Sequence, residues 1–374
     1  MTDYLPLDSI LTGDCIDILA ALPAESVDLV FADPPYNLQL RQELRRPNET
    51  LVDGVTDAWD QFESFAEYDG FTRAWLSGCR RVLKRDGAIW VIGSYHNIYR
   101  VGAILQDLGF WILNDVVWIK TNPMPNFRGV RLANAHETLI WAAKTDRSRY
   151  TFHHRAAKVY NDGKQLRSDW TIPLCTGAER LRVDGRKVHS TQKPEALLER
   201  VLTVSTEPGQ IVLDPFLGSG TTAAVARRLG RRWIGIEQRS EYVVHALKRV
   251  AAVEPDPLRG AGCAAGRSSG TPPRVPFARL VHLGYLNAGD RLYFQGSVAH
   301  VAVVTGDGKL QCEGQEGSIH QIARHCAGGK PCNGWERWRY RTPCGGLAPI
   351  DQLRWLAAGP AGSAQESQPE AQDE

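Results

Sequence analysis

The sequence lacks a long hydrophobic run. No apolar stretch in its 374 residues approaches the roughly 20 residues that a membrane-spanning helix needs. The polar start, MTDYLPLDS, also lacks the basic and then apolar layout of a secretory signal. We therefore expect a cytoplasmic protein that does not bind a membrane.

Closely spaced cysteine pairs are also missing. The chain has 8 cysteines, and none are arranged in the C-x2-C spacing of a structural zinc site. Four of them lie near His320 and His325 in the last part of the chain, namely Cys312, Cys326, Cys332 and Cys344. A long chain of intracellular appearance favours free thiols over a disulfide framework, so we expect thiols and no metal.

A strong net charge is absent too, because the formal charge is only +2. That balance is uneven along the chain. The final segment AQESQPEAQDE is purely acidic, whereas RQELRRP, RSRYTFHHR and RRLGRR are basic. The folded body is therefore more basic than the total, and local patches can bind nucleic acid.

The first 250 or so residues alternate short apolar runs with amphipathic stretches. This pattern is typical of an α/β fold in which helices flank a mainly parallel sheet. The apolar runs predict strands at 27–35, 88–94, 110–120, 137–144, 210–216 and 232–237. Apolar residues at helical spacing predict helices at 71–84, 97–109, 194–205, 221–230 and 240–253.

A change in composition divides the chain. Residues 254–275 are rich in Pro, Gly, Ala and Ser and show no periodicity, which indicates a linker between a domain at 1–253 and a small α+β domain at 276–357. In the small domain we expect a hairpin turning at Gly306-Asp307-Gly308 and helices around 318–326 and 349–358. Residues 358–374 are small and acidic, and we expect them to be disordered.

The first chemical motif is Asp33-Pro34-Pro35-Tyr36, directly after the predicted strand VDLVFA. Two consecutive prolines make a rigid turn at the carboxyl end of a strand, which is where open α/β sheets bind ligands. A carboxylate and a prolyl carbonyl there can each accept one hydrogen of an exocyclic amine, so that its lone pair points at a methyl donor. Tyr36 can stack on an extracted base. A chance turn at the end of a strand is the alternative.

The second motif is the run Asp214-Pro215-Phe216-Leu217-Gly218-Ser219-Gly220-Thr221-Thr222, between a predicted strand and a predicted helix. The glycines permit a tight turn and close approach to a ligand, and the helix start offers free N–H groups. Glu237 ends the next predicted strand, where a carboxylate can take both hydroxyls of a ribose. This layout predicts a nucleoside site. A nicotinamide enzyme is the alternative, although Ala223 stands at the third glycine position of the dinucleotide fingerprint.

Together the two motifs resemble those of the amino-methyltransferases that use S-adenosylmethionine. The first motif lies 181 residues before the second, which resembles the permuted order of the beta class. The chain is more similar still to the cell-cycle-regulated bacterial adenine methyltransferases, and this similarity covers nearly all of residues 1–250. It extends through DPPYNLQL, WDQFESF, GAIWVIGSYHNI, NPMPNF, NAHETLIWA, RSDWTIPLC and TQKPEALL.

The resemblance implies a Rossmann-like methyltransferase fold and methylation of adenine N6 in duplex DNA at GANTC. Asp in the first motif position points to adenine, whereas cytosine-N4 enzymes more often have Ser there. The family commonly has Pro where Ser190 stands, which puts the local backbone contacts in doubt. The expected cofactor residues, partly from the motifs and partly from the resemblance, are Asp14, Cys15, Asp33, His189, Lys193, Asp214, Phe216, Gly218, Gly220, Thr221, Thr222 and Glu237.

The C-terminal part resembles the domain associated with restriction enzymes and adenine methylases. The similarity lies in GSIH, CNGW, Trp338 and PIDQLR, and it implies a role in DNA binding and strand opening. A packing or dimerisation module with tryptophans in its core is the alternative.

Two further segments are candidates for DNA contact. The loop NLQLRQELRRPNET joins leucines, which can enter base steps, to arginines, which can take phosphates or guanine edges; such leucines are as often core residues. NPMPNFRGVRLANAHET reads as an ordered loop near DNA. The DNA-contacting residues that we expect are Leu38, Leu40, Arg41, Leu44, Arg45, Asn126, Arg128, Arg131 and Trp335.

The sequence leaves other functions open. The same fold methylates cytosine N4 or RNA, and a catalytically silent DNA-binding protein could retain it. The completeness of both motifs argues against a silent copy. A half-symmetric DNA target would suit a homodimer.

Overall fold

The computed structural model describes residues 5–38, 60–126, 129–183, 185–189, 191–256, 274–297, 299–341 and 347–358. They form two compact units, one of Met1–His153 with Leu166–Gly260 and the other of His154–Gln165 with Ala261–Glu374. No helix in these ranges is long and apolar enough to cross a membrane. Most of the expected linker and all but the first residue of the expected tail fall outside the described residues.

The first unit is built on one sheet of eight strands in the order β1-β10-β9-β2-β3-β5-β4-β6. The first five strands of that order run parallel to one another, whereas β5 runs antiparallel to both β3 and β4. The strands are β1 (Ser9–Thr12), β2 (Val27–Ala32), β3 (Leu83–Gly93), β4 (Trp111–Ile119), β5 (His136–Ala143), β6 (Asp169–Thr171), β9 (Ile211–Asp214) and β10 (Arg232–Glu237).

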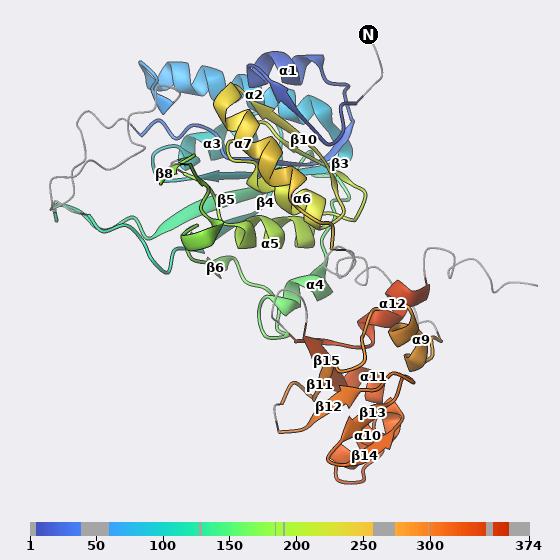
Figure 1. Cartoon of the computed structure of the whole chain (residues 1–374). Helices are drawn as coiled ribbons and strands as arrows, with labels where there is room; N and C mark the ends of the chain where they lie inside the picture. Colours follow the sequence, from blue (N-terminus) through green and yellow to red (C-terminus); the bar gives the residue numbers. More distant parts are fainter. Residues whose placement is uncertain are drawn as a thin grey trace, which may run out of the picture. The chain divides into compact units, whose positions relative to one another are not determined.

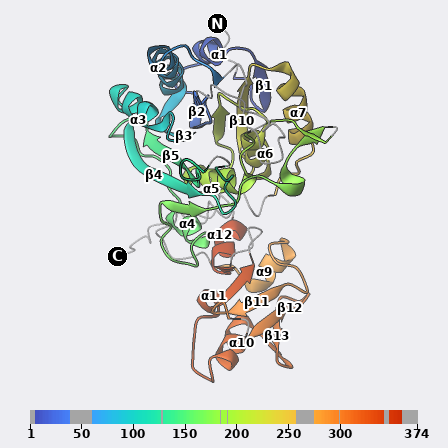
Figure 2. The same cartoon turned by 90° about the vertical axis from the view of Figure 1, so that its left-hand side faces the viewer.

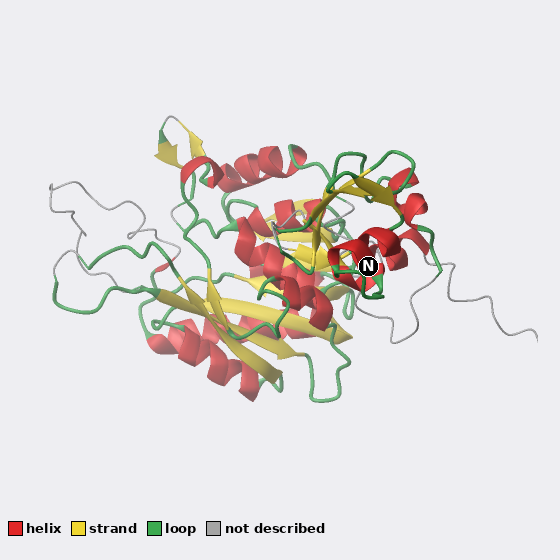
Figure 3. Ribbon diagram, turned by 90° about the horizontal axis from the view of Figure 1, so that it is seen from below, coloured by secondary structure: helices red, strands yellow, loops and turns green. Residues whose placement is uncertain are grey.

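Helices cover both faces of this sheet (Figure 3). On one face α1 packs against α2, and α2 against α3 (Figures 1 and 2). A second group consists of α5, α6 and α7, in which each helix contacts the next. The six helices are α1 (Cys15–Ala21), α2 (Phe65–Val82), α3 (Ile98–Asp107), α5 (Glu195–Ser205), α6 (Thr221–Arg228) and α7 (Ser240–Ala251).

Strand β2 is apolar along almost its whole length because both of its faces are buried. Successive side chains of a strand point to opposite faces. Val30 and Ala32 join the core beneath α1, α2 and α3, so Leu29 and Phe31, which are also buried, face the opposite layer. A rigid, fully buried strand thus delivers the turn that follows it to the sheet edge.

These findings confirm the predicted α/β fold, in which helices flank a mainly parallel sheet, with one difference in detail. The expected mainly parallel order holds for five strands, but β5 is antiparallel to both neighbours. The reason is local: the described residues between β4 and β5, 120–126 and 129–135, hold no crossover helix, and a direct connection reverses the chain. The remaining short elements are α4 (His154–Val159), η2 (Gly177–Glu179) and the ribbon of β7 (Arg182–Val183) and β8 (Arg186–Lys187).

The C-terminal unit has its own antiparallel sheet, in the order β14-β13-β12-β11-β15-β16. The predicted hairpin joins β12 to β13, and Gly308 in its turn has φ +75°, which favours glycine. The predicted helix at 318–326 is α10, and Ser318 and Gln321 form a capping box at its start. The elements are β11 (Arg291–Phe294), β12 (Val301–Val304), β13 (Leu310–Cys312), β14 (Gln315–Gly317), β15 (Trp338–Arg341), β16 (Leu347–Pro349), α9 (Phe277–His282), α10 (Ile319–Cys326), α11 (Gly334–Arg337) and α12 (Gln352–Ala358).

Candidate active site

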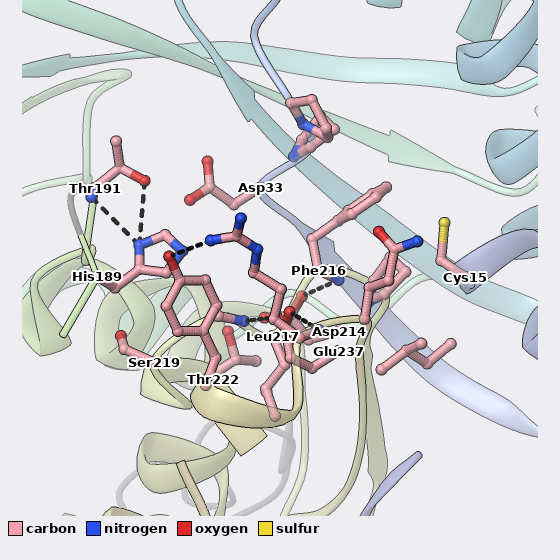
Figure 4. Close-up of a pocket in the computed structure, with 18 of the residues that line it drawn as sticks. Cys15, Asp33, His189, Thr191, Asp214, Phe216, Leu217, Ser219, Thr222 and Glu237 are labelled. Carbon is pink, nitrogen blue, oxygen red and sulfur yellow. Dashed lines mark hydrogen bonds between the residues drawn. The ribbon is translucent and has the colours of Figure 1, made fainter. Parts of the chain in front are cut away.

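A pocket opens in the first unit at the carboxyl ends of four neighbouring parallel strands. Its lining includes residues that directly follow or end β1, β10, β9 and β2, among them Asp14, Glu237, Asp214 and Asp33. Between β9 and β2 the strand order reverses along the chain, and open α/β sheets bind ligands at such a switch point. Figure 4 shows Asp33, Phe216, Glu237 and Cys15 around this space.

The turn after β2 is held by residues from the next segment of the chain. The carboxylate of Asp60 accepts hydrogen bonds from the backbone N–H groups of Tyr36, Asn37 and Leu38, the last two at 2.8 and 3.1 Å. The hydroxyl of Tyr68 donates to the carbonyl of Pro35 at 2.9 Å. Every one of these contacts restrains the backbone, so the side chains of the turn project from a fixed base.

Asp33 faces a buried lysine. Lys193 Nζ lies 2.7 Å from Asp33 Oδ2 and 3.9 Å from Glu137 Oε2. Glu137 in turn accepts a hydrogen bond from the hydroxyl of Tyr36 at 2.9 Å. It also forms an ion pair with Lys120, whose Nζ lies 2.8 Å from Glu137 Oε1. Two lysines thus neutralise two carboxylates, with the tyrosine ring beside them.

The pKa shifts in this group follow from burial and charge. Burial raises the pKa of Asp33, and the ammonium of Lys193 offsets this only in part. Burial also disfavours the charged forms of Glu137 and Lys193, but the opposite charges nearby outweigh it. The two lysines lower the pKa of Glu137, and the two carboxylates raise the pKa of Lys193. The opposite charges thus favour the ionised forms of Lys193 and Glu137, whereas burial favours the neutral form of Asp33.

The other half of the pocket is formed by the loop between β9 and α6. Asp214 Oδ1 accepts from the backbone N–H of Phe216 at 2.9 Å, and Glu237 Oε2 accepts from that of Gly218 at 2.8 Å. The ring of Phe216 packs edge-on against Trp75 with ring centroids 5.2 Å apart. The loop therefore presents a fixed aromatic ring close to a carboxylate at the end of a strand.

Glycine is favoured at two positions of this loop for different structural reasons. Gly218 has φ +53°, and a Cβ on it would lie 3.1 Å from His189 Nε2. Gly220 has φ +78° and begins α6, and a Cβ on it would lie 2.9 Å from the Cβ of Ala246. Gly218 lines the pocket, whereas Gly220 is not among its lining residues and instead permits close packing of α6 on α7.

The remaining predicted cofactor residues all line the pocket: Asp14, Cys15, His189, Thr221 and Thr222. Asp14 also caps α1, since its Oδ1 accepts from the N–H of Ile16 at 2.8 Å. His189 packs on the ring of Tyr242 with centroids 4.8 Å apart. Burial, with Lys193 and other nearby cations, lowers the pKa of His189 to about 4, so its ring is neutral at pH 7.

This lining suits a nucleoside. Phe216 offers an apolar ring face, and Glu237, whose carboxylate lies at the end of β10, can accept from hydroxyl groups of a ribose. Desolvation raises the pKa of the buried Asp214 carboxyl to about 7. Among the described residues, no group of three or more His, Cys, Asp or Glu could hold a metal ion.

The predicted DNA-contacting residues are scattered. Leu38 is half-buried and lines the pocket, so it does not project as a free wedge. Asn126 is half-buried and Arg131 is exposed, both in the loop between β4 and β5. The rest of the first unit's candidates, Leu40, Arg41, Leu44, Arg45 and Arg128, lie outside the described residues.

Trp335 has a packing role in the C-terminal unit. Its side chain is 8% exposed and belongs to the hydrophobic core of the C-terminal unit. It packs against Phe277, with ring centroids 6.0 Å apart, and the guanidinium of Arg354 lies 4.8 Å from the centre of its ring. Burial of a large aromatic ring is favourable, so packing gives one reason for Trp335, and its contact with DNA stays a prediction.

Sequence reasoning missed three residues of the site: Asp60, Lys120 and Glu137. Asp60 and Glu137 belong to the segments WDQFESF and NAHETLIWA, which carried the family resemblance without a role for either carboxylate. Glu137 stands in the mostly polar stretch 134–138, ahead of the apolar run 139–143, so no local pattern marked it as a buried charge. Buried charges need partners. Which partners they have is decided only by the fold.

Comparison with known proteins places the site in a family. The model of a DNA methylase family matches residues 27–248, and the model described as Restriction Enzyme Adenine Methylase Associated matches residues 259–356. The chain is 45% identical to the Type II methyltransferase M.HinfI of Haemophilus influenzae over 350 residues, covering 93% of this chain and 96% of the relative.

A second relative is the Type II methyltransferase M2.LlaDCHI of Lactococcus lactis subsp. cremoris. It is 43% identical over 239 residues, which cover 64% of this chain and 87% of that protein. Among solved structures, the cytosine-N4-specific PvuII DNA methyltransferase matches 64% of this chain and 85% of its own length, with 25% identity and a TM-score of 0.51.

Proposed function

The chain belongs to the DNA methylase family, and on that premise we propose that it transfers a methyl group from S-adenosylmethionine to N6 of adenine in duplex DNA at the sequence GANTC. One observation carries the proposal. A single pocket is lined by the turn that holds Asp33 and Tyr36 and by the loop that holds Phe216, although the two are far apart in sequence. Glu237 also lines this pocket.

Asp33 and the carbonyl of Pro34 would orient the amine. When each accepts one N–H, the nitrogen becomes pyramidal and its lone pair is directed outward. S-adenosylmethionine, when bound, supplies an activated methyl group on a sulfonium. The new N–C bond forms as the C–S bond breaks, and that bond's electron pair stays on sulfur. The surplus amine proton leaves along the hydrogen bond to Asp33, whose pKa is raised by burial.

Tyr36 would hold the base. An amine inside a duplex cannot reach the pocket, so the nucleotide has to rotate out of the stack. The aromatic ring of Tyr36 offers a face on which the extracted base can stack. Stacking there has a lower free energy than leaving the base exposed to water. The Asp60 and Tyr68 contacts keep the backbone of this turn from yielding as the base enters.

The cofactor would occupy the other half of the pocket. Glu237 accepts the ribose hydroxyls, Phe216 contacts the adenine ring, and the neutral His189 lies beside the Gly218 turn. Asp14, Cys15, Thr221 and Thr222 complete this side of the lining. A neutral histidine suits a site for a cation, because a second positive charge would repel the sulfonium.

The choice of adenine rests on Asp33 as the first residue of its motif, and the GANTC site rests on the resemblance to the cell-cycle-regulated adenine methyltransferases. Cytosine N4 or RNA is the alternative substrate, since the fold alone serves both. We further propose that 1–253 forms the methyltransferase domain and that the C-terminal domain at 276–357 binds DNA. A homodimer would match a half-symmetric site.

The test is transfer of a tritiated methyl group to duplexes that contain GANTC or a scrambled site, followed by nucleoside analysis. We expect N6-methyladenine in the GANTC duplex alone. Label on cytosine or on RNA would overturn the substrate, and N6-methyladenine in both duplexes would overturn the site specificity. No label in any polymer would overturn the proposed activity.

A further inference from the structure

Glu137 is a buried carboxylate that the proposed chemistry does not use. It lies near the start of β5, and its side chain is 12% exposed. One oxygen pairs with Lys120 at 2.8 Å. The other accepts from the hydroxyl of Tyr36 at 2.9 Å and lies 3.9 Å from Lys193 Nζ. Glu137 thus contacts two groups that themselves touch the substrate-facing side of the pocket.

We propose that Glu137 is a positioning residue for the methyl transfer: it fixes the ring of Tyr36 through its hydroxyl and offers Lys193 a second carboxylate, which frees Asp33 for the substrate amine. This inference rests on the proposed function, because it assigns Asp33 and Tyr36 their roles at the amine and the base.

The contact with Tyr36 restrains the ring. A tyrosine held only by its backbone can swing about its side-chain torsions, whereas one anchored at its hydroxyl as well has a single orientation. A base can stack only on a ring that presents its face, and preorganisation of that face reduces the entropy lost on binding. Because Lys120 holds the far oxygen of Glu137, the anchor itself does not turn.

The contact with Lys193 addresses a conflict at Asp33. Asp33 Oδ2 is engaged by Lys193 at 2.7 Å, so an N–H of the amine that approaches this oxygen competes with the ammonium, although the carboxylate has further acceptor sites. Lys193 is buried, so losing its partner would leave an unpaired ammonium away from water. Glu137 Oε2, at 3.9 Å, is a second partner within reach of a small movement. The lysine can therefore shift toward Glu137 as the amine arrives.

The first experiment compares Glu137→Gln with Glu25→Gln. Glutamine keeps the size of Glu137 and its acceptor but removes the charge. Glu25 is an exposed carboxylate paired with Lys144 and serves as the matched control. We expect kcat of Glu137→Gln to fall at least about tenfold, as for other losses of alignment, with the affinity for S-adenosylhomocysteine unchanged. Loss of the Glu137 charge also lowers the pKa of Asp33, so the acid limb of the kcat profile should move to lower pH.

A purely structural role would lower the melting temperature and reduce cofactor affinity together, without moving the pH profile. An unchanged kcat, or a lower kcat with an unmoved acid limb, overturns the proposal. A double-mutant cycle with Tyr36→Phe adds a second criterion. The two substitutions should be less than additive, because both act on the same hydrogen bond: Glu137→Gln removes the charge of its acceptor and Tyr36→Phe removes its donor. Full additivity contradicts the Tyr36 part of the proposal.

A measurement that needs no transfer keeps this inference separate from the proposed function. In protein labelled with carbon-13 at the tyrosine Cζ, the signal of Tyr36 is assigned by its loss in Tyr36→Phe. We expect that signal to shift in Glu137→Gln and to stay in place in Glu25→Gln. An unmoved signal overturns the inference even if the enzyme methylates GANTC. Absence of any transfer by the wild-type chain, with the signal shifted, overturns the proposed function and leaves the contact intact.

Discussion

Lys193 Nζ lies 2.7 Å from Asp33 Oδ2, although 160 residues separate the two in sequence. The lysine comes from the segment before α5 and the aspartate from the end of β2. Their pairing balances the charge of the carboxylate that we assign to the amine. It also means that the ammonium of Lys193 lies at an oxygen that could accept a substrate N–H.

Asp33→Asn should abolish most of the transfer while leaving the cofactor site intact. An amide keeps the size of the side chain but loses the charge that receives the amine hydrogen. We expect kcat to fall by about 10²–10⁴-fold and the affinity for S-adenosylhomocysteine, measured by calorimetry, to stay close to that of the wild type. Retained transfer would remove Asp33 from the catalytic role.

Glu237→Gln should weaken cofactor binding. A charged acceptor contributes about 1.5–3 kcal/mol to each hydrogen bond that it makes, so losing it from ribose hydroxyls should raise the Kd for S-adenosylhomocysteine by about tenfold or more. Glu241→Gln, at an exposed position in the first turn of α7, is the control and should bind like the wild type. Equal affinities of all three proteins would argue against Glu237 as the ribose acceptor.

Gly220→Ala should destabilise the first unit more than Gly230→Ala does. Both glycines have positive φ, +78° and +69°, so alanine is strained at either position by about 1–2 kcal/mol. Only at Gly220 would the new Cβ meet Ala246, and such overpacking costs a further 1–3 kcal/mol or so. Urea unfolding of the two variants measures the difference. Partial recovery in Gly220→Ala with Ala246→Gly would identify the contact, and equal losses in the two single variants would refute it.

Asp214 should make stability depend on pH. Desolvation raises its pKa to about 7 in the folded protein, against about 3.9 in an unfolded chain. The folded state therefore holds the proton more tightly, and the stability that this contributes is fully present below pH 4 and is lost as the pH rises through 7.

Asp214→Asn keeps an acceptor for the N–H of Phe216. Because asparagine does not titrate, the variant should not lose stability as the pH rises through 7. Relative to the wild type, its free energy of unfolding should increase by a few kcal/mol between pH 4 and 8, since one pKa unit is worth about 1.4 kcal/mol. Thermal unfolding without cofactor is the measurement, with Asp107→Asn on an exposed surface as the control. A difference that does not change with pH would contradict the shift.

Local sequence patterns were enough to predict the alternating strands and helices, the rigid turn at Asp33 and Tyr36, and the glycine loop before α6. These depend on side-chain periodicity, proline and glycine within a few residues of each other. The family resemblance then supplied the chemistry that those motifs imply.

Contacts between residues that are distant in sequence could not be predicted in this way, because they depend on how the chain packs. Asp60 holds the turn after β2, Glu137 joins Tyr36 and Lys193, and Gly220 packs on Ala246 because the strand order and helix packing bring these residues together. It also placed Trp335 in the core. Burial and pairing are properties of the packed chain, and they depend on contacts between segments that no local pattern encodes.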